Sequence, residues 1–356
     1  MFREELNAVF KEKMIEAVLV SDGYNMRYLS GFRGATGYLY ITSKRQVLLT
    51  DSRYTTQAKE EALEFEVIEI SNQKGYGAFI GEMTRADEIN AIGFENDHMI
   101  YADFMKLKEA CSEELCWKGM GDSLNRLRIV KNEKELSCME KAQSIADGAF
   151  SHIIEILKPG MTELQVAAEL EFYLKSHGAN GTSFDTIAAS GIHSAMPHAM
   201  PSNKAIDSGD FLTMDFGCIY EGYCSDMTRT VVVGKASAKQ KEIYQIVLEA
   251  QLAALDVIKA GMRGSEVDKV ARDVIENAGY GEYFGHGLGH SVGLYIHEEP
   301  RLSPKCDEVL KENVIETVEP GIYIPEFGGV RIEDIVIVKE NGCQNMTHST
   351  KELLEL

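Results

Sequence analysis

The pattern of apolar and polar positions divides the chain into two parts. Up to about residue 127, short apolar runs alternate with charged stretches of helical character, such as TTQAKEEALE. Short apolar runs bounded by turn residues are typical of β-strands. The expected strands are AVLVSD (17–22), GYLYIT (37–42), RQVLLTD (45–51), FEVIEI (65–70) and INAIGFE (89–95). We therefore expect a small α/β domain over residues 1–127.

Long amphipathic helices are predicted after the stretch GDSLNRLRIVKNEKE, which marks a domain boundary and leaves residues 128–356 for a second domain. This part contains an internal repeat. IIEILKPGMTELQVAAELEFYLKSHGA (153–179) resembles ALDVIKAGMRGSEVDKVARDVIENAGY (254–280). Each copy reads as a helix, a K-x-G-M turn and a second helix, so we expect a duplicated structural unit.

Capping boxes support the starts of two of these helices. Thr162 is followed three residues later by Gln165, and Ser237 by Gln240. In such a pair the hydroxyl and the amide side chain satisfy backbone N–H groups at the helix start. We therefore expect helices to begin at these positions.

The first repeat is followed by an apolar β-hairpin that contains two acids. The stretch FLTMDFGCIYEGYCSDMTRTVVV (211–233) carries Asp215 and Asp226. A two-residue loop at Tyr220 and Glu221 would place position 215 opposite 226, with Cβ atoms ~5 Å apart. Facing carboxylates repel unless a proton or a cation lies between them. The alternative is that both acids point into water as solubilising charges.

The second repeat is followed by a similar apolar hairpin, VIETVEPGIYIPEFGGVRIEDIVIV, which carries Glu319 and Glu333. If the two hairpins pack face to face, four carboxylates meet in one apolar layer. Burial of unpaired charge is costly, and divalent cations are the simplest means of neutralising such a group. The duplication therefore favours a metal site over solubilising charges.

Histidines concentrate in the glycine-rich stretch GHGLGHSVGLYIHEEP, which contains His286, His290 and His297. No Glu follows His286, and the glycines disfavour a helix, so this is not the H-E-x-x-H motif of zinc proteases. An extended loop that approaches a ligand closely fits better. His198 lies in the loop SGIHSAMPHAMPSN before the first hairpin, together with His193, which we interpret as a surface residue.

Carboxylates with one imidazole and no thiolate form a hard ligand set that favours Mn, Fe(II) or Co over structural zinc. Two ions joined by bridging carboxylates can hold a hydroxide that hydrolyses an amide or a phosphoester. Phosphoester chemistry calls for cationic side chains, and the motif stretches supply only Arg229 and Arg331. We therefore favour amide hydrolysis.

Composition and charge limit the classes of binding partner and the cellular compartment that we expect. The formal net charge of -20 and the absence of a basic stretch argue against nucleic acid or an anionic membrane as partner. The charged N-terminal stretch and the lack of long apolar runs predict a cytosolic protein. The 7 cysteines form no C-x-x-C pair, which favours reduced thiols over disulfides or a zinc site.

Four ordered motifs resemble the proline-specific branch of the metallopeptidase family that includes methionine aminopeptidase, aminopeptidase P and prolidase. They are SGIHSAMPHAMPS, DFGCIYEGYCSDMTRTV, GHGLGHSVGLYIHE and TVEPGIYIPEFGGVRIED. The resemblance implies an α/β (α+β) protein with a small creatinase-like N-terminal domain and a pseudo-twofold "pita-bread" catalytic domain. It also implies an exopeptidase that hydrolyses the Xaa-Pro bond of dipeptides or of short peptides with proline at position two.

The resemblance assigns the metal ligands to five positions. They are Asp215, Asp226, His290, Glu319 and Glu333, with Asp226 and Glu333 bridging two divalent ions. Manganese is the expected metal, with Co, Fe and Zn as alternatives.

Roles around the metals follow from the same resemblance. His198 and His297 match histidines that contact the substrate and stabilise the tetrahedral intermediate, and Glu319 matches the proton acceptor for the attacking water. His286 and Tyr323 resemble residues that line the proline pocket. We expect Arg331 and Thr228 to orient the ligating carboxylates.

Two alternatives remain, methionine aminopeptidase-like activity and a catalytically silent binding module on the same fold. The N-terminal domain argues against the first, and five intact ligands argue against the second. The family suggests a homodimer. For closure of the cleft we considered the N-terminal domain of a partner chain, with ordinary surface polarity as the alternative for each of its polar residues. The polar residues considered for this closure are Asn25, Arg27, Tyr28, Asp51 and Arg53.

Overall fold

The described residues up to Arg128 contain a six-stranded mixed sheet in the computed structural model, which describes residues 2–356. The strands are β1 (Ala17–Val20), β2 (Tyr38–Thr42), β3 (Gln46–Thr50), β4 (Glu66–Glu69), β5 (Ala91–Phe94) and β6 (Cys116–Gly119). Their order across the sheet is β4-β3-β2-β1-β5-β6. The helices are α1 (Phe2–Lys13), α2 (Gly23–Ser30), α3 (Thr55–Glu61), α4 (Tyr76–Ala86) and α5 (Tyr101–Ala110). Five of the six strands were expected from the sequence.

Apolar clusters cover both faces of this sheet. Val18, Val20 and Leu39 belong to one cluster, whereas their neighbours Leu19 and Tyr40 belong to the other. The alternation follows from the two-residue period of a strand. Asn25, which we considered for contact with a partner chain, is 2% exposed and donates to a carboxylate inside this unit. That consideration was wrong for Asn25, because its polarity is satisfied internally.

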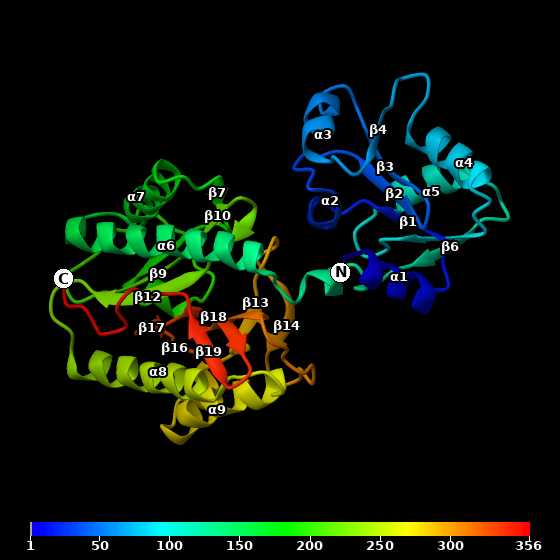
Figure 1. Ribbon diagram of the computed structural model, residues 1–356. Helices are drawn as coiled ribbons and strands as arrows, with labels where there is room; N and C mark the ends of the chain where they lie inside the picture. Colours follow the sequence, from blue (N-terminus) through cyan, green and yellow to red (C-terminus); the bar gives the residue numbers. More distant parts are fainter. Residues whose placement is uncertain (1) are drawn as a thin grey trace. The chain divides into compact units, whose positions relative to one another are not determined.

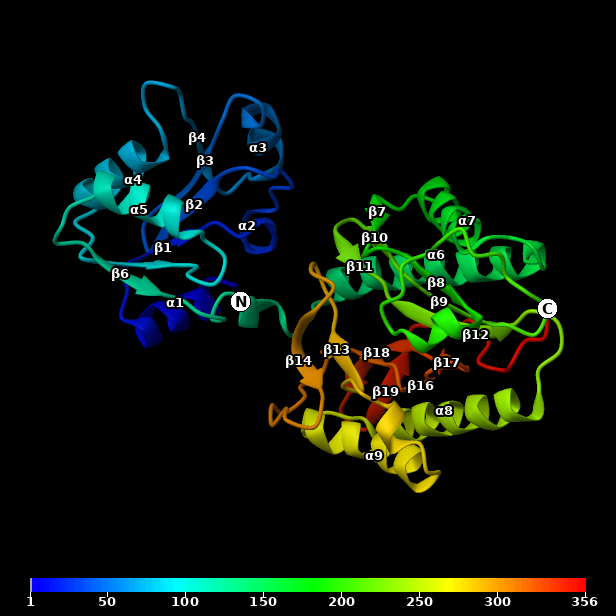
Figure 2. The same cartoon turned by 180° about the vertical axis from the view of Figure 1, so that it is seen from behind.

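The second unit, residues Ile129–Leu356, places its helices on two outer sides with the strands between them (Figures 1 and 2). The helices are α6 (Glu133–Ile156), α7 (Glu163–Ser176), α8 (Ala238–Val257) and α9 (Gly264–Asn277). The strands of the first half are β7 (Gly181–Thr182), β8 (Ile187–Ser190), β9 (Phe211–Phe216), β10 (Cys218–Tyr220), β11 (Tyr223–Cys224) and β12 (Met227–Val232). Those of the second half are β13 (Gly289–Ser291), β14 (Glu298–Leu302), β15 (Ile315–Val318), β16 (Gly321–Ile324), β17 (Gly328–Arg331), β18 (Asp334–Lys339) and β19 (Gly342–Asn345).

The internal repeat is visible in the backbone hydrogen bonds of the two halves. Gly160, at the turn between α6 and α7, has φ 90° and donates to the carbonyl of Ile206 over 2.9 Å. Gly261, at the turn between α8 and α9, has φ 91° and donates to Leu310 over the same distance. A positive φ is a conformation that glycine adopts without strain. Both predicted capping boxes, at Thr162 and Ser237, are confirmed.

Each half has an apolar core between its helices and its strands. One core joins α6 and α7 to β9 and β12, and the other joins α8 and α9 to β15 and β18. Within residues 2–356, none of the helices combines the length and the apolar character that a bilayer span requires. All seven cysteines are free thiols.

Candidate metal centre and substrate cavity

The first hairpin differs from the expected register by two residues. Glu221 and Gly222 both have positive φ, 45° and 81°, and form the two-residue turn, so Asp215 pairs with Thr228 rather than with Asp226. The predicted pairing of 215 with 226 was therefore wrong. A two-residue turn with positive φ at both positions matches the twist of a hairpin. Glycine adopts positive φ without strain, so the turn forms at Glu221-Gly222. Because the shift is even, both aspartates keep the same face of the ladder.

Three of the four predicted acids lie at interruptions between strands rather than within them. Asp226 lies between β11 and β12, Glu319 between β15 and β16, and Glu333 between β17 and β18. At these points the chain passes from one sheet to another. Asp215 lies in β9 and follows Ile206 by the same nine residues by which Glu319 follows Leu310, so these two acids hold equivalent places in the repeat.

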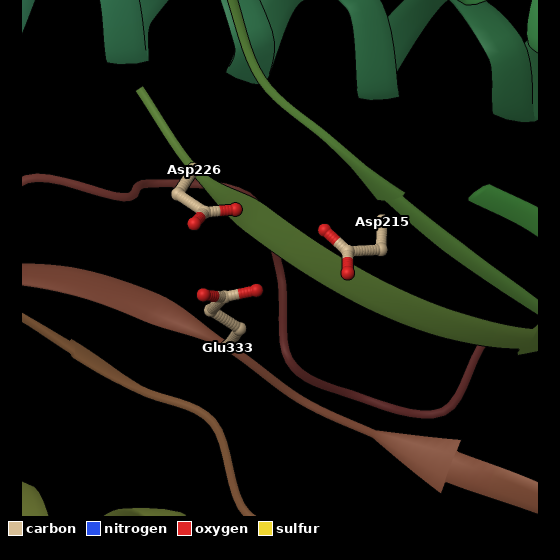
Figure 3. A group of neighbouring side chains, drawn as sticks. All are labelled: Asp215, Asp226 and Glu333. Carbon is tan, nitrogen blue, oxygen red and sulfur yellow. The ribbon is translucent and has the colours of Figure 1, made fainter. Parts of the chain in front are cut away.

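Asp215, Asp226 and Glu333, here called the acid triad, meet between the two halves. Each contributes one carboxylate oxygen to a group whose members lie within 4.8 Å of one another. Figure 3 shows the three side chains pointing toward one another from separate segments. Oδ1 of Asp215 and Oε1 of Glu333 are buried and have no hydrogen-bond partner among the described residues. Buried, unpartnered carboxylate oxygens in such a group fit a divalent cation.

His290 and Glu319 join the acid triad beside Asp226. The Nε2 atom of His290 lies 3.7 Å from Oδ2 of Asp226 and 3.4 Å from Oε1 of Glu319. Nδ1 of His290 donates to the carbonyl of Ser291 over 3.1 Å, which leaves the lone pair of Nε2 directed at the acids. The five predicted ligand positions are thus gathered in one place.

The protonation states reflect burial of many acids together. Burial and the neighbouring carboxylates raise the pKa values of Asp226 and Glu333 well above the ordinary range. Burial raises the pKa of Glu319 to about 7, against the opposing charge of Arg331. Burial lowers the pKa of His290 to about 3, so its ring is neutral and able to ligate. Cation binding would relieve the repulsion between the acids.

Arg331 and Thr228 hold two acids of the triad, Asp215 and Glu333. Nη2 of Arg331 contacts Oδ2 of Asp215 at 2.6 Å, and its Nε donates to the hydroxyl of Thr228 over 3.1 Å. The Thr228 hydroxyl donates in turn to Oε2 of Glu333 over 2.6 Å. Asp215 and Glu333 therefore each have one oxygen held by the protein, and Oδ1 of Asp215 and Oε1 of Glu333 remain available to a ligand.

A cavity of about 600 Å³ opens over this centre. His198, His286, His297 and Arg331 line it together with the five predicted ligands. Tyr323 is not among the described residues that line the cavity. Its hydroxyl lies 2.9 Å from Nε2 of His286 and 2.8 Å from Nη1 of Arg331, which both line it. Burial lowers the pKa of His286 to about 4, so this histidine is neutral.

The lining of the cavity also includes apolar residues and a further arginine. Its apolar residues are Phe184, Ile187, Pro197, Ala199, Met200 and Pro201. Arg301 also lines it, and its Nε lies 3.3 Å from Oε1 of Glu299 in an exposed ion pair. Our sequence interpretation missed Arg301, which stands in the strand that follows His297. A basic residue four positions after a motif histidine was the available signal.

Glu163 is a second residue that the sequence interpretation missed. Its buried carboxylate accepts hydrogen bonds from the N–H and hydroxyl of Ser190, from Ser202 and from Nδ1 of His193. Ser190 and Ser202 flank the loop that carries His198. The assignment of His193 as a plain surface residue was therefore incomplete, because its ring helps to fix this loop. As the first residue of α7, Glu163 resembles an ordinary helix-start acid in the sequence.

Comparison with known proteins covers both units. The model of metallopeptidase family M24 matches residues 137–340, and that of the Creatinase/Prolidase N-terminal domain matches residues 3–130. An Xaa-Pro dipeptidase from Pyrococcus horikoshii is 42% identical over 96% of this chain and 95% of its own. The structure of an Xaa-Pro dipeptidase from Bacillus anthracis superposes with a TM-score of 0.96 at 44% identity, covering 99% and 98% of the two chains. The structure of an X-Pro aminopeptidase from Thermotoga maritima gives 0.92 at 39% identity, covering 98% and 100%.

Proposed function

This chain belongs to metallopeptidase family M24, and from that premise we propose that it hydrolyses the Xaa-Pro bond at the free amino end of dipeptides or short peptides. It is a metal-dependent peptidase with the expected two-domain architecture and a pita-bread catalytic unit. One observation carries the proposal. The acid triad, His290 and Glu319 line one cavity together with His198, His286 and His297.

We propose two Mn²⁺ ions per chain, held by Asp215, Asp226, His290, Glu319 and Glu333. The orphaned oxygens of Asp215 and Glu333 support this occupancy, and the oxygen-rich ligand set fits Mn²⁺. When bound, such ions polarise a substrate carbonyl and lower the pKa of a water molecule.

The protein's own groups supply the proton transfers and the oxyanion contacts. Glu319 lines the cavity and is suited to accept the proton of the attacking water and to pass it to the leaving proline nitrogen. His198 and His297 lie in the cavity wall, where their N–H groups can donate to the developing oxyanion. Arg331 keeps Asp215 in place, and the neutral ring of His286 forms part of the pocket for the proline ring.

The first experiment uses metal-stripped protein reconstituted separately with Mn²⁺, Co²⁺ and Zn²⁺. Products from Xaa-Pro, Xaa-Pro-Xaa and Met-Ala-Xaa peptides are identified by mass spectrometry. We expect cleavage before proline. We expect no cleavage when the amino terminus of the same Xaa-Pro peptides is acetylated. Cleavage of the dipeptide alone would identify a dipeptidase, and cleavage of the longer peptide an aminopeptidase. Release of Met from Met-Ala-Xaa alone would contradict the proposal.

Glu319→Gln separates an enzyme from a binding module. It removes the proton acceptor while keeping the side-chain size, so turnover should fall by about 100-fold or more. Glu312→Gln, an exposed acid nearby in the sequence, is the matched control. If neither the unmodified chain nor Glu319→Gln turned over any peptide, and both bound the same peptides, the catalytic reading would fail.

The family suggests a homodimer, and we include it in the proposal together with closure of the cleft by a partner's N-terminal unit. Arg53, which pairs with Asp51, remains 70% exposed and is available for such a contact. Light scattering that gave a monomeric mass would contradict this part. The cytosolic location expected from the charged N-terminal stretch and the lack of long apolar runs stays a prediction.

A further inference from the structure

Two side-chain contacts join β12 to the start of β18, one between Thr228 and Glu333 and one between Arg229 and Asp334. Thr228 and Arg229 are consecutive, as are Glu333 and Asp334, so their side chains point to opposite sides. On the metal side, Thr228 donates to Glu333 over 2.6 Å. On the other side, Nη2 of Arg229 donates to Oδ1 of Asp334 over 2.8 Å. The side chain of Glu333 is therefore held by Thr228, and its backbone carbonyl is held by Arg229.

Arg229 is 1% exposed, and each of its five N–H groups has an acceptor. Nη1 donates to the carbonyls of Thr228 and Glu333, and Nη2 to Asp334 and to the carbonyl of Ser349. Nε donates to the carbonyl of Thr350 over 2.9 Å. A guanidinium has five donors in a rigid plane, so its acceptors are held in fixed relative positions.

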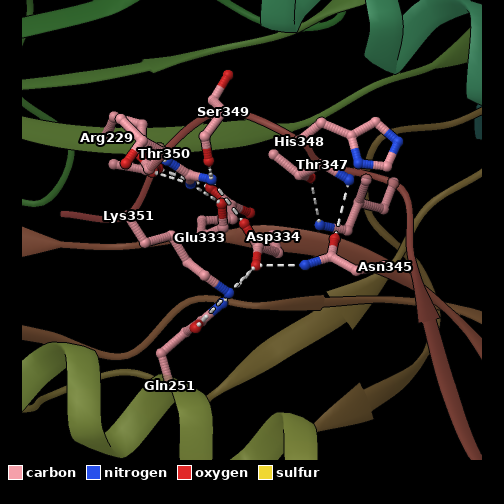
Figure 4. A network of polar contacts seen from close by, with 12 residues as sticks. Arg229, Gln251, Glu333, Asp334, Asn345, Thr347, His348, Ser349, Thr350 and Lys351 are labelled. Atoms are coloured by element: carbon pink, nitrogen blue, oxygen red, sulfur yellow. Dashed lines mark hydrogen bonds and ion pairs between the residues drawn. The ribbon is translucent and has the colours of Figure 1, made fainter.

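Asp334 is the matching acceptor and is fully buried. Its Oδ2 accepts from Nε2 of Gln251 over 2.9 Å, from Nδ2 of Asn345 over 2.7 Å and from Nζ of Lys351 over 2.6 Å. Figure 4 shows this network around Asp334 and Arg229. The contacts reach α8, β19 and the residues that follow β19.

Residues 347–356, here called the closing segment, supply three members of this network: Ser349, Thr350 and Lys351. The segment is held at both ends. Asp147 of α6 accepts from the N–H groups of His348 and Ser349. Beyond the network, Val232 exchanges backbone hydrogen bonds with Leu354 and Leu356 over 2.9 Å.

We propose that the closing segment is a positioning part of the metal centre, which acts through Arg229 and Asp334 to hold Glu333 in its ligating place. This inference deepens the proposed function by naming what fixes its metal site. If the segment is displaced, two of the five Arg229 donors lose their acceptors. A buried donor without an acceptor is costly, so the Arg229 guanidinium would shift. The backbone carbonyl of Glu333, which accepts a hydrogen bond from this guanidinium, would shift with it. Loss of such outer partners commonly weakens metal affinity by about 10- to 100-fold.

Asp147→Ala tests the proposal away from the metal ligands, because it releases the N–H groups of His348 and Ser349. We expect Mn²⁺ to bind metal-stripped full-length protein about 5- to 10-fold more weakly by isothermal titration calorimetry. Turnover should recover at saturating Mn²⁺. Asp147→Asn keeps an acceptor oxygen and should bind Mn²⁺ nearly as the unchanged chain does. Glu155→Ala, an exposed acid on the same helix, is the control.

Arg229→Lys tests the same connection from its centre. A single ammonium cannot reach all five acceptors, so Mn²⁺ affinity should fall by about 10-fold or more. Unchanged Mn²⁺ affinity in Asp147→Ala would overturn the proposal, as would a loss of turnover that excess Mn²⁺ does not restore. If Arg229→Lys fails to fold, Asp147→Ala still decides. The calorimetric readout needs no substrate, so it distinguishes failure of this inference from failure of Xaa-Pro hydrolysis.

Discussion

Arg331 contacts three side chains of the centre at once, Asp215, Tyr323 and Thr228. Arg331→Lys keeps the charge but replaces the three donor nitrogens of the guanidinium, each of which contacts a different side chain, by a single nitrogen. We expect kcat/KM at saturating Mn²⁺ to fall by about 100-fold, because the Asp215 carboxylate loses its fixed orientation. Arg263→Lys, at an exposed ion pair, is the control. Equal kcat/KM values in both variants would show that only the charge at Arg331 matters.

Arg301 bears on the choice between dipeptide and longer substrates. Its guanidinium lies in the cavity wall and is suited to hold the free carboxylate of an Xaa-Pro dipeptide. Arg301→Met should raise the KM for the dipeptide by about 10-fold or more and change the KM for a longer Xaa-Pro peptide much less. Steady-state kinetics on the two substrates gives the answer. A similar change in both KM values would mean that Arg301 does not contact the carboxylate.

The residues found from the sequence differ in kind from those that were missed. Asp215, Asp226, Glu319 and Glu333 are conspicuous because acids are rare in apolar hairpins. Asp334 was overlooked beside Glu333, although it too is an acid in an apolar strand. Its partners Gln251 and Lys351 lie 83 and 17 residues away in the chain, and only the folded structure brings them together.

At the scale of elements, the loop that carries His198 depends on α7. Glu163, at the start of α7, binds both ends of this loop through Ser190 and Ser202. Glu163→Gln replaces one accepting oxygen by a donor. We expect kcat to fall by about 10-fold while Mn²⁺ affinity is unchanged, because the metal ligands lie on other segments.

The control for this change is Glu169→Gln, which alters a half-exposed acid on the same helix. Steady-state kinetics and Mn²⁺ calorimetry are measured on both variants. Weaker Mn²⁺ binding in Glu163→Gln would place Glu163 among the supports of the metal centre instead. An unchanged kcat would show that the loop keeps its position without this carboxylate.

The sequence predicted elements well where the interactions that define them join residues close together in the chain. The boxes at Thr162 and Ser237 involve residues three positions apart, so the sequence alone determines them. The hairpin register depended on which two residues adopt positive φ, and the choice of Tyr220-Glu221 over Glu221-Gly222 shifted it. β6 was missed because Cys116–Gly119 is short and contains a lysine, and only pairing with β5 makes it a strand.

At the scale of the whole molecule, the stability that the buried acids of the metal centre contribute to the metal-free protein should fall as pH rises. Glu319 has an ordinary pKa of 4.5 when unfolded and about 7 when folded, so the folded form retains a proton that the unfolded form has released. Its stabilising contribution is therefore complete below about pH 4.5 and is lost as pH rises to about 7. Asp226 and Glu333 shift in the same direction.

Added Mn²⁺ should reverse this trend, because the ligating carboxylates must be ionised. The gap in Tm between Mn²⁺-loaded and chelator-treated protein should widen between about pH 5 and 7, as measured by scanning calorimetry. Glu319→Gln should reduce the slope of the metal-free curve. A gap of constant size would mean that the acids do not carry the pH dependence.

The duplication has a consequence for the way the chain unfolds. Asp226 and Glu333 come from different copies of the repeat and are separated by on the order of 100 residues, so an ion that both of them ligate closes a loop of that length. Such an ion would act as a reversible cross-link between the two halves. Neither half can then open by itself without releasing the ion. We expect amide hydrogen exchange in β9 and β18 to slow together on Mn²⁺ binding, and to become independent when the ion is removed.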